Sequence, residues 1–179
     1  DLAEVVGEVL SDLEPAVRAV DATIRVPEAA PVVRGNPTLL RQIFSNLLQN
    51  AVHHTPAGGA ITVRASVGRD GSVSVGVHNT GSFIPPEDLP RVFERFFQVD
   101  RARARKGGSS GLGLAIVSEI VEAHGGAIRV TSDAGTGTEF TVTLPPANTR
   151  DARGHRIAAI DPGDPKRTAR NREAPAPNP

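Results

Sequence analysis

Apolar residues recur every three or four positions in three stretches of the chain, which is the spacing of one face of an α-helix. These stretches cover residues 2–17, 39–51 and 112–124. Asn36-Pro37 precedes the second stretch, where asparagine is a favoured N-cap and proline fits the first helical turn. Thr55-Pro56 ends the second stretch and Gly125-Gly126 ends the third. We therefore predict three long helices.

Runs of β-branched residues between these stretches predict β-strands. The runs cover residues 22–26, 32–34, 60–67, 72–78, 127–131 and 138–144. Gly68-Arg69-Asp70-Gly71 separates the third run from the fourth and predicts an antiparallel hairpin. A short helix is expected after Pro85-Pro86. This order favours the α+β class, as a two-layer α/β sandwich whose mixed, mostly antiparallel sheet carries helices on one face.

Length and composition are those of one globular domain with a short extension. The chain has 179 residues, of which 39% are hydrophobic and 22% charged. It contains no cysteine, which excludes disulfides, thiolate metal sites and a thiol nucleophile. The formal net charge is zero, so we expect no nucleic-acid partner. No run reaches the roughly 18 apolar residues of a membrane span, and the missing initiator methionine predicts a fragment of a longer protein.

The end of the chain differs in composition from the rest. Residues 147–179 hold seven Lys/Arg against four Asp/Glu, are rich in proline, and have Ile157 and Ile160 as their large apolar residues. So few apolar side chains do not offset the entropy of ordering the segment. We expect a folded domain over 1–146 and a disordered Pro/Arg-rich tail over 147–179, with a basic arm that touches a partner as the alternative.

Three polar residues share one face of the second predicted helix. Asn46, Asn50 and His53 stand at i, i+4 and i+7. An asparagine oxygen suits the shell of a Mg²⁺ ion that phosphate oxygens and water also hold, although these groups are equally suited to meeting loops or solvent. His53 and the adjacent His54 point about 100° apart on a helix and cannot chelate one metal together.

Three glycine-containing segments lie at the ends of predicted elements. His78-Asn79-Thr80-Gly81 ends a strand, and Gly135-Thr136-Gly137-Thr138 enters the last one. Residues 107–114 place four glycines before the N-terminus of the third helix, where free N–H groups and the helix dipole favour a phosphate. This segment lacks the Gly-Lys-Ser/Thr of a P-loop and the third glycine of a dinucleotide fingerprint, and a flexible hinge is the alternative.

Taken in this order, the motifs resemble the ATP-binding catalytic domain of bacterial sensor histidine kinases, of the GHKL or Bergerat type. Residues 46–56 resemble the N box, 79–86 the first glycine box, 93–97 the F box and 107–114 the second glycine box. Residues 135–138 take the place of the last glycine box. The resemblance covers residues 1–145 and implies the Bergerat fold.

The resemblance implies ATP and Mg²⁺ as ligands and assigns roles to single residues. Asn50 would hold Mg²⁺, Asn46 would assist at the phosphates, and His53 would reach phosphate, which makes these three the catalytic candidates. His54 would flank the base, Asn79 would face the adenine amino group, and Thr138 would support it through a water. The remaining candidates for the nucleotide site are Gly81, Ile84, Arg103, Gly107, Gly108, Ser109, Ser110, Gly111, Leu112, Gly113 and Leu114.

Other implied features concern the lid and two departures from the family pattern. Arg103 would close on the γ-phosphate. Phe93, Phe96 and Phe97 would anchor the lid by packing, with an exposed docking surface for a partner helix as the alternative. The family commonly carries aspartate at position 79 and glycine at position 83, where this chain has Asn79 and Phe83. An asparagine can accept from the adenine amine and donate to a ring nitrogen, so we expect weaker binding rather than none. An Asn-Thr-Gly first box resembles VanS-like actinobacterial sensors.

The resemblance also implies what lies outside the chain. None of the five histidines stands in the family's His-Glu-x-x-Thr-Pro context, so the phosphoacceptor would belong to a separate dimerisation domain that passes the phosphoryl group to a response regulator. The fragment would be monomeric and cytoplasmic, and its parent homodimeric and anchored in the bacterial cell membrane. A degenerate docking module without kinase activity and an anti-sigma-factor serine kinase of the same fold are the alternatives. Asn46 occupies the place of the general-base glutamate of hydrolytic relatives, which predicts negligible ATP hydrolysis.

Overall fold

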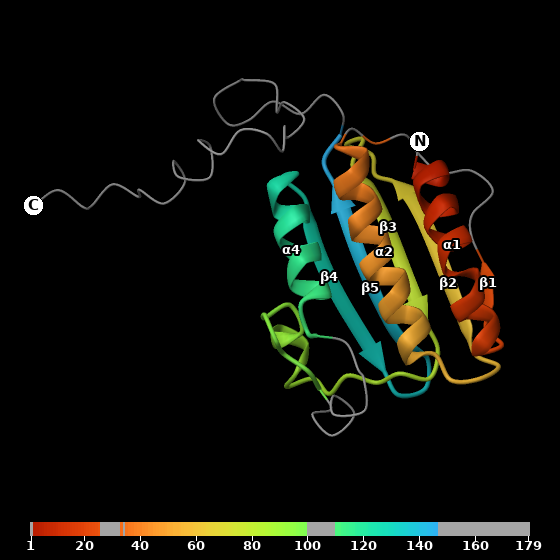
Figure 1. Cartoon of the computed structure of the whole chain (residues 1–179). Coiled ribbons are helices and arrows are strands. Elements are labelled where there is room, and N and C mark those ends of the chain that lie inside the picture. The colour runs from red at the N-terminus through yellow and green to blue at the C-terminus, as the bar shows by residue number, and fades with distance from the viewer. Residues whose placement is uncertain (1, 26–32, 34, 100–109, 147–179) are drawn as a thin grey trace, which may run out of the picture.

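A computed structural model describes residues 2–25, 33, 35–99 and 110–146 (Figure 1). The order of elements is α1 (Leu2–Ala19), β1 (Thr23–Arg25), α2 (Pro37–His54), β2 (Ala60–Val67), β3 (Val73–Asn79), the 3₁₀ helix η1 (Leu89–Arg91), α4 (Gly113–Ala123), β4 (Ala127–Asp133) and β5 (Gly137–Leu144). The predicted tail over 147–179 lies outside the described residues and stays a prediction. None of the helices in the described ranges combines the length and the apolar character that crossing a membrane requires.

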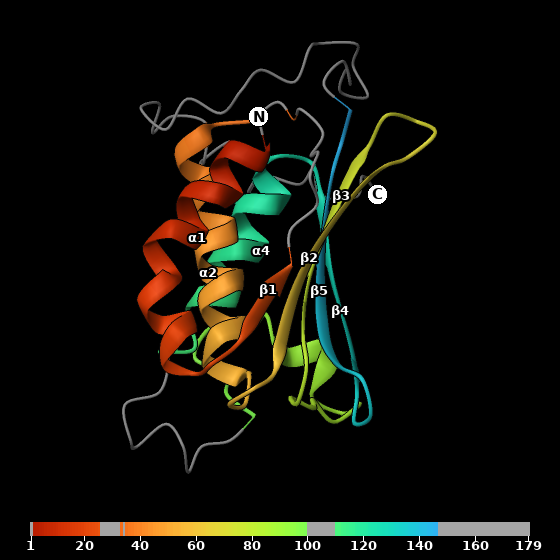
Figure 2. The ribbon, with the colours of Figure 1, turned by 90° about the vertical axis from the view of Figure 1, so that its right-hand side faces the viewer.

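The strands form one mixed sheet in the order β1-β2-β3-β5-β4. β1 runs parallel to β2, and the other neighbouring strands are antiparallel. In Figure 2 the helices α1, α2 and α4 all lie on one side of the sheet, and the opposite face carries no helix of the described chain. The predicted two-layer α+β sandwich with helices on one face is therefore confirmed.

The second helix begins and ends where the sequence predicts. Asn36 accepts hydrogen bonds from the backbone N–H groups of Thr38 and Leu39 at 2.9 and 3.4 Å, and Pro37 opens the first turn. At the other end the buried hydroxyl of Thr55 donates to the Ala51 carbonyl at 2.6 Å. These bonds satisfy backbone groups at both ends of α2 and define where the helix begins and ends.

The strand predictions hold except at one segment. The predicted strand over 22–26 is present as the three residues of β1, and both hairpins are present. In the first hairpin, Asp70 accepts hydrogen bonds from the Ser72 side chain and backbone, and these lower the pKa of its carboxyl group. A strand over 32–34 is wrong at Val33, which belongs to no strand, and residues 32 and 34 lie outside the described residues. The short helix expected after Pro85-Pro86 is η1.

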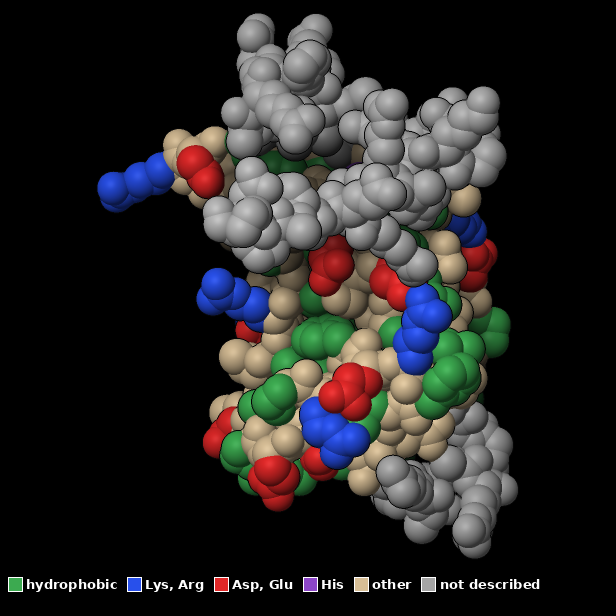
Figure 3. Space-filling model, turned by 90° about the vertical axis from the view of Figure 1, so that its left-hand side faces the viewer, with side chains coloured by type: hydrophobic (Ala, Val, Ile, Leu, Met, Phe, Trp, Pro, Cys, Tyr) green, Lys and Arg blue, Asp and Glu red, His purple; other side chains and the backbone are tan. Residues whose placement is uncertain are grey.

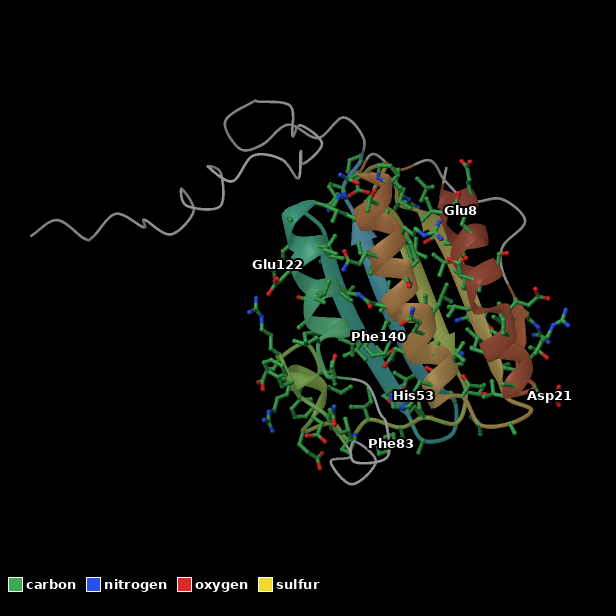
Figure 4. All side chains as sticks on the ribbon, in the orientation of Figure 1. Glu8, Asp21, His53, Phe83, Glu122 and Phe140 are labelled. Carbon is green, nitrogen blue, oxygen red and sulfur yellow. The ribbon has the colours of Figure 1, made fainter. Side chains whose placement is uncertain are left out.

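The core lies between the sheet and the helices. Alternate residues of the central strands point into it, and each is at most 4% exposed: Val73, Val75, Val77, Phe140, Val142 and Leu144. Phe44 and Leu47 of α2 are fully buried against them. On the outer side, Arg41 of α2 forms ion pairs with Glu8 and Asp12 of α1, and Figure 4 shows Glu8 on α1. Apolar burial is thus the main force that fixes α2 on the sheet.

Replacing Ile43 by alanine should destabilise the fold by about 2–5 kcal/mol, because the side chain is fully buried and its loss leaves a cavity. Val67 is 60% exposed at the end of β2, so Val67→Ala is the control and should cost less than about 1 kcal/mol. The measurement is urea unfolding followed by circular dichroism, since the chain has no Trp or Tyr. Equal effects of the two changes would contradict this placement of the core.

Candidate functional site

A row of polar side chains crosses the helix-facing side of the sheet at one end. Asn79 of β3 pairs with Thr138 of β5, and Thr138 pairs with Ser132 of β4. Asn79 and Thr138 are each 1% exposed. One step further along the strands the same side is apolar, with Val77 opposite Phe140. The core therefore changes from aliphatic to polar at this level of the sheet.

Hydrogen bonds connect this polar row to the loop that follows β3. Asn79 Nδ2 donates to Ser82 Oγ at 2.9 Å, and Ser82 Oγ donates to Thr138 Oγ1 at 2.9 Å. Thr138 Oγ1 donates to the Ser82 carbonyl at 3.2 Å and lies 2.8 Å from Ser132 Oγ. The backbone N–H of Ile84 donates to Ser132 Oγ at 2.8 Å. The network satisfies these buried groups and fixes the loop over the end of the sheet.

The Asn79 amide uses its nitrogen within the network. One N–H of Nδ2 is directed at Ser82, and the Thr80 carbonyl lies 3.4 Å from the same nitrogen. The hydrogen bonds of this network engage the amide nitrogen and not Asn79 Oδ1. The side-chain oxygen is therefore the group left to act toward a ligand, as an acceptor. Both N–H groups of the amide already have acceptors in the protein, so none remains to donate to a ring nitrogen as expected.

The loops after α2 and after β3 lie against each other. Gly81 has φ +80°, and a Cβ added to it would lie 2.5 Å from Cδ of Pro56. The hydroxyl of Thr80 accepts a hydrogen bond from the Ala60 N–H at 2.9 Å. Glycine at position 81 thus serves both the backbone conformation and the close approach of the two loops.

The polar face of α2 extends from the helix layer toward the same end of the sheet. Asn46 is half-buried, and its Nδ2 is buried without a hydrogen-bond partner among the described residues. Asn50 is half-buried, and His53 is exposed at the end of α2, at the same end of the molecule as Phe83 (Figure 4). The rings of His53 and His54 are edge-on with centroids 4.8 Å apart. The orphaned amide of Asn46 is a donor that still lacks an acceptor.

The N-terminus of α4 lies beside Asn46. A Cβ built on Gly113, the first residue of α4, would lie 3.5 Å from Asn46 Oδ1. The N-cap residue is Leu112, whose side chain forms no capping bond. The first-turn N–H groups of α4 are therefore not satisfied by a side-chain cap and point away from the helix, as at anion sites.

A backbone contact joins this helix start to the F-box segment. Phe96 N donates to the Gly111 carbonyl at 2.9 Å. Gly111 has φ +69°, and a Cβ there would lie 2.9 Å from the Phe96 backbone. Phe96 itself has φ +66° and is 72% exposed. Its side chain does not pack, so the prediction that it anchors the lid by packing is wrong, and its contribution is made through the backbone.

The other two phenylalanines of the segment do pack. The Phe93 ring meets Phe140 edge-on at 6.2 Å, and the guanidinium of Arg91 lies 4.5 Å above the Phe97 ring. Arg95 pairs with Glu119 of α4, and this hydrogen bond raises the pKa of the guanidinium. Figure 3 shows the face of α4 and this segment, where acidic, basic and apolar side chains are interspersed.

The structure brings together part of the predicted site. Asn79, Thr138 and Ile84 share one network, and Asn46 lies beside Gly113. Ser110 is exposed just before α4, and Leu114 is half-buried against the core. The predicted residues Arg103, Gly107, Gly108 and Ser109 lie outside the described residues. The ligand roles assigned to all of these residues stay predictions.

Sequence reasoning missed Ser82 and Ser132. In β4, Ser132 follows Ile128 and Val130 on the side of the strand that faces the helices. A polar residue at a position where the alternation predicts an apolar one could have marked Ser132 as part of a site. Ser82 lies in a loop, where serine is ordinary, and no pattern marks it.

A hollow of about 160 Å³ lies beside this end of the sheet and shares Ser132 with the polar row. It is lined by His78, Thr131, Ser132, Asp133, Thr136, Gly137 and Glu139. His78 Nε2 is 2.9 Å from the Thr136 carbonyl. Across the described part of the chain, no three His, Cys, Asp or Glu side chains are grouped so that they could hold a metal.

Alanine at Gly81 should disturb the site more than alanine at Gly58. Gly58 has φ +74° but nothing within 4 Å of an added Cβ, so its replacement isolates backbone strain, about 1–2 kcal/mol. Gly81→Ala adds the collision with Pro56 and should lower the stability further. Urea unfolding of both variants measures the difference, and equal losses would contradict the close approach of the two loops.

Comparison with known proteins identifies the family and the fold. Residues 35–148 match the HATPase_c model, described as histidine kinase-, DNA gyrase B- and HSP90-like ATPase. The sensor histidine kinase CusS of Escherichia coli K12 is 47% identical over 145 residues, which cover 81% of this chain and 30% of CusS. The chain spans about a third of the length of the curated relatives it matches.

Solved structures of histidine kinases superpose on the chain. The mycobacterial sensor histidine kinase MprB has a TM-score of 0.70 and 33% identity, covering 81% of this chain and 94% of that one. The histidine kinase ThkA, solved in complex with the response regulator TrrA, has a TM-score of 0.67 and 28% identity, covering 81% and 40%. The chain therefore belongs to the HATPase_c family, as an ATP-binding catalytic domain of the kind found in sensor histidine kinases.

Proposed function

We propose that this chain binds Mg-ATP and delivers the γ-phosphoryl group to a histidine on a dimerisation domain that lies outside it. The observation that carries the proposal is the convergence of three elements. The uncapped start of α4 lies beside the orphaned Asn46 amide of α2, and the polar row of the sheet closes the same end of the core. Such a site offers donors for phosphates and an acceptor for a base.

The base end of the site is built around Asn79. Its Oδ1 is the acceptor that the network leaves available, and an adenine amino group is a donor that fits it. Thr138 lies beneath, with its hydroxyl held by Ser82 and Ser132. A buried acceptor penalises bases that cannot donate to it, because it would otherwise remain unpaired.

The phosphate end is built around α4 and α2. The donors at this end are the first-turn N–H groups of α4, which have no side-chain cap, and the amide of Asn46, which has no partner among the described residues. A triphosphate would satisfy both, and the helix dipole would favour its negative charge. His53, exposed at the end of the same face of α2, is the candidate to reach the phosphates from the other side.

The donor set near α2 fits a metal ion that phosphate itself helps to hold. The described residues provide no cluster of three His, Cys, Asp or Glu, but Asn50 supplies a neutral oxygen of the type that completes a Mg²⁺ shell. When bound, the ion would neutralise charge on the phosphates.

Chemistry at this site would be positioning rather than proton removal. Asn46 stands where hydrolytic relatives carry a glutamate, and an amide cannot take a proton from water. The residues would therefore hold the γ-phosphoryl group for an incoming histidine without activating water. Phosphoryl transfer needs little covalent help from the protein, which agrees with such a site.

The further partners are inferred from the relatives. ThkA was solved with the response regulator TrrA, which supports a response regulator as the final acceptor here. We place the phosphoacceptor histidine, the dimer contacts and a membrane anchor in the part of the parent protein outside this chain. The catalytic domain itself would be cytoplasmic and monomeric.

Replacing Asn50 by alanine should weaken binding of ATP in the presence of Mg²⁺ by about tenfold to a hundredfold, the loss expected for one bond to a charged group. Binding without Mg²⁺ should change less. Gln49→Ala is the control, because Gln49 is exposed on the same helix and bonds Ser45. Calorimetric titration of ATP, ADP and GTP measures these affinities, and equal effects of the two variants would refute the role of Asn50.

Mixing the chain with the parent's dimerisation domain and γ-labelled ATP should label a histidine. The label should be lost in acid, because phosphohistidine is acid-labile and phosphoserine is not. Acid-stable label would favour the serine kinase, and absence of label would favour a docking module.

The chain alone should hydrolyse ATP negligibly, and Asn46→Glu should raise this rate, within the roughly 10²–10⁴-fold range of general-base catalysis. Release of inorganic phosphate is the measurement. A rate unchanged from background would count against this account of position 46.

A further inference from the structure

We propose that Ser82 is a positioning residue for base selection, because it holds the Asn79 amide with its oxygen toward the base. The inference rests on the proposed nucleotide site and adds to it a residue that sets specificity. It concerns position 79, where this chain carries asparagine.

An amide at this position raises a problem that a carboxylate does not. A carboxylate presents an acceptor oxygen whichever way it is turned, whereas an amide presents an oxygen in one orientation and an N–H group in the other. Rotation of Asn79 by half a turn would convert the base-facing acceptor into a donor. The side chain is 1% exposed, so its orientation depends mainly on the protein groups around it.

Each hydroxyl group of the network has one hydrogen to donate, and this determines which way the Asn79 amide faces. Ser82 Oγ donates to Thr138 Oγ1, whose own hydrogen has an acceptor in the Ser82 carbonyl at 3.2 Å. The Ser82 hydrogen is therefore used on Thr138, which leaves the lone pairs of Ser82 Oγ facing Asn79. Only the NH₂ end of the amide can meet an acceptor there, at 2.9 Å.

A second acceptor supports the same orientation. The Thr80 carbonyl lies 3.4 Å from Asn79 Nδ2, and a rotated amide would place its oxygen against that carbonyl. Ser132 completes the arrangement: it accepts from Ile84 N–H, so its own hydrogen is free to meet Thr138. Every hydroxyl of the network then donates once, and the oxygen of Asn79 is left for the base.

The consequence concerns the group at position 6 of a purine. Adenine carries an amine there, which can donate to Asn79 Oδ1. Hypoxanthine and guanine carry a carbonyl oxygen, which would face the amide oxygen and be repelled. Without the Ser82 hydroxyl, the Asn79 amide can turn and donate to that carbonyl, so discrimination between the two groups should fall.

Calorimetric titration of ATP and ITP, with Mg²⁺, into the full chain tests this inference. ITP is chosen because it differs from ATP at position 6 of the base. The unchanged chain should prefer ATP, and Ser82→Ala should reduce the ATP-to-ITP affinity ratio by about fivefold, the effect of one net hydrogen bond. Ser82→Thr keeps the hydroxyl and should retain the ratio.

Two further variants distinguish an effect on the orientation of the Asn79 amide from a general disturbance of the fold. In an Asn79→Asp background, Ser82→Ala should leave the ratio unchanged, because a carboxylate presents an oxygen either way. Ser74→Ala is the matched control, since Ser74 forms a similar cross-strand contact with Thr143 at 3.0 Å, at the other end of the same strand pair. A ratio unchanged in Ser82→Ala, or reduced equally in the aspartate background, would overturn the inference.

A measurement without nucleotide keeps this inference distinct from the proposed function. In the unchanged chain, the side-chain amide protons of Asn79 should exchange slowly with solvent in NMR spectra, and Ser82→Ala should speed their exchange. Rapid exchange in the unchanged chain would overturn the orientation by Ser82 even if ATP binds. Slow exchange with no binding of ATP would support the orientation while refuting the proposed function.

Discussion

The antiparallel pairing of β3 with β5 is the constraint on which the rest of the site depends. These strands are not consecutive in the chain, and their register places Asn79 opposite Thr138 inside the helix-facing layer. Buried polar groups need partners, and here the partners come from the neighbouring strand and from the loop after β3. A slip by one residue would turn Asn79 to the open face of the sheet and exchange the polar row for apolar side chains.

The helices add the other half of the arrangement. The buried apolar face of α2 fixes the helix on the sheet. This packing also positions the polar residues of α2 at the end of the sheet. α4 packs beside α2 and brings its uncapped first turn to Asn46. The site is therefore formed by rigid elements on three sides, while the loop residues complete it.

The sequence predicted the elements better than it predicted their contacts. Periodicity and capping residues located α2 because helix signals are local, and Gly68 to Gly71 located the first hairpin for the same reason. The adjacency of β3 and β5 follows from tertiary packing, which no local pattern specifies. Ser82 was missed because its role depends on that adjacency. Phe96 was misjudged because an aromatic residue in a cluster of aromatics gives no sign of a left-handed backbone that turns it outward.

The hydrogen bond between Phe96 and Gly111 has a consequence for how such domains diverge. It joins the chain on either side of the segment between them, so the entry and exit points of that segment are fixed by the fold. The entropy of closing a loop grows only slowly with its length, by about 0.6 kcal/mol for each doubling. Insertions and deletions between residues 97 and 110 would therefore leave α4 and the polar row in place. The segment can therefore change in length over evolution while the framework of α2, α4 and the sheet is retained.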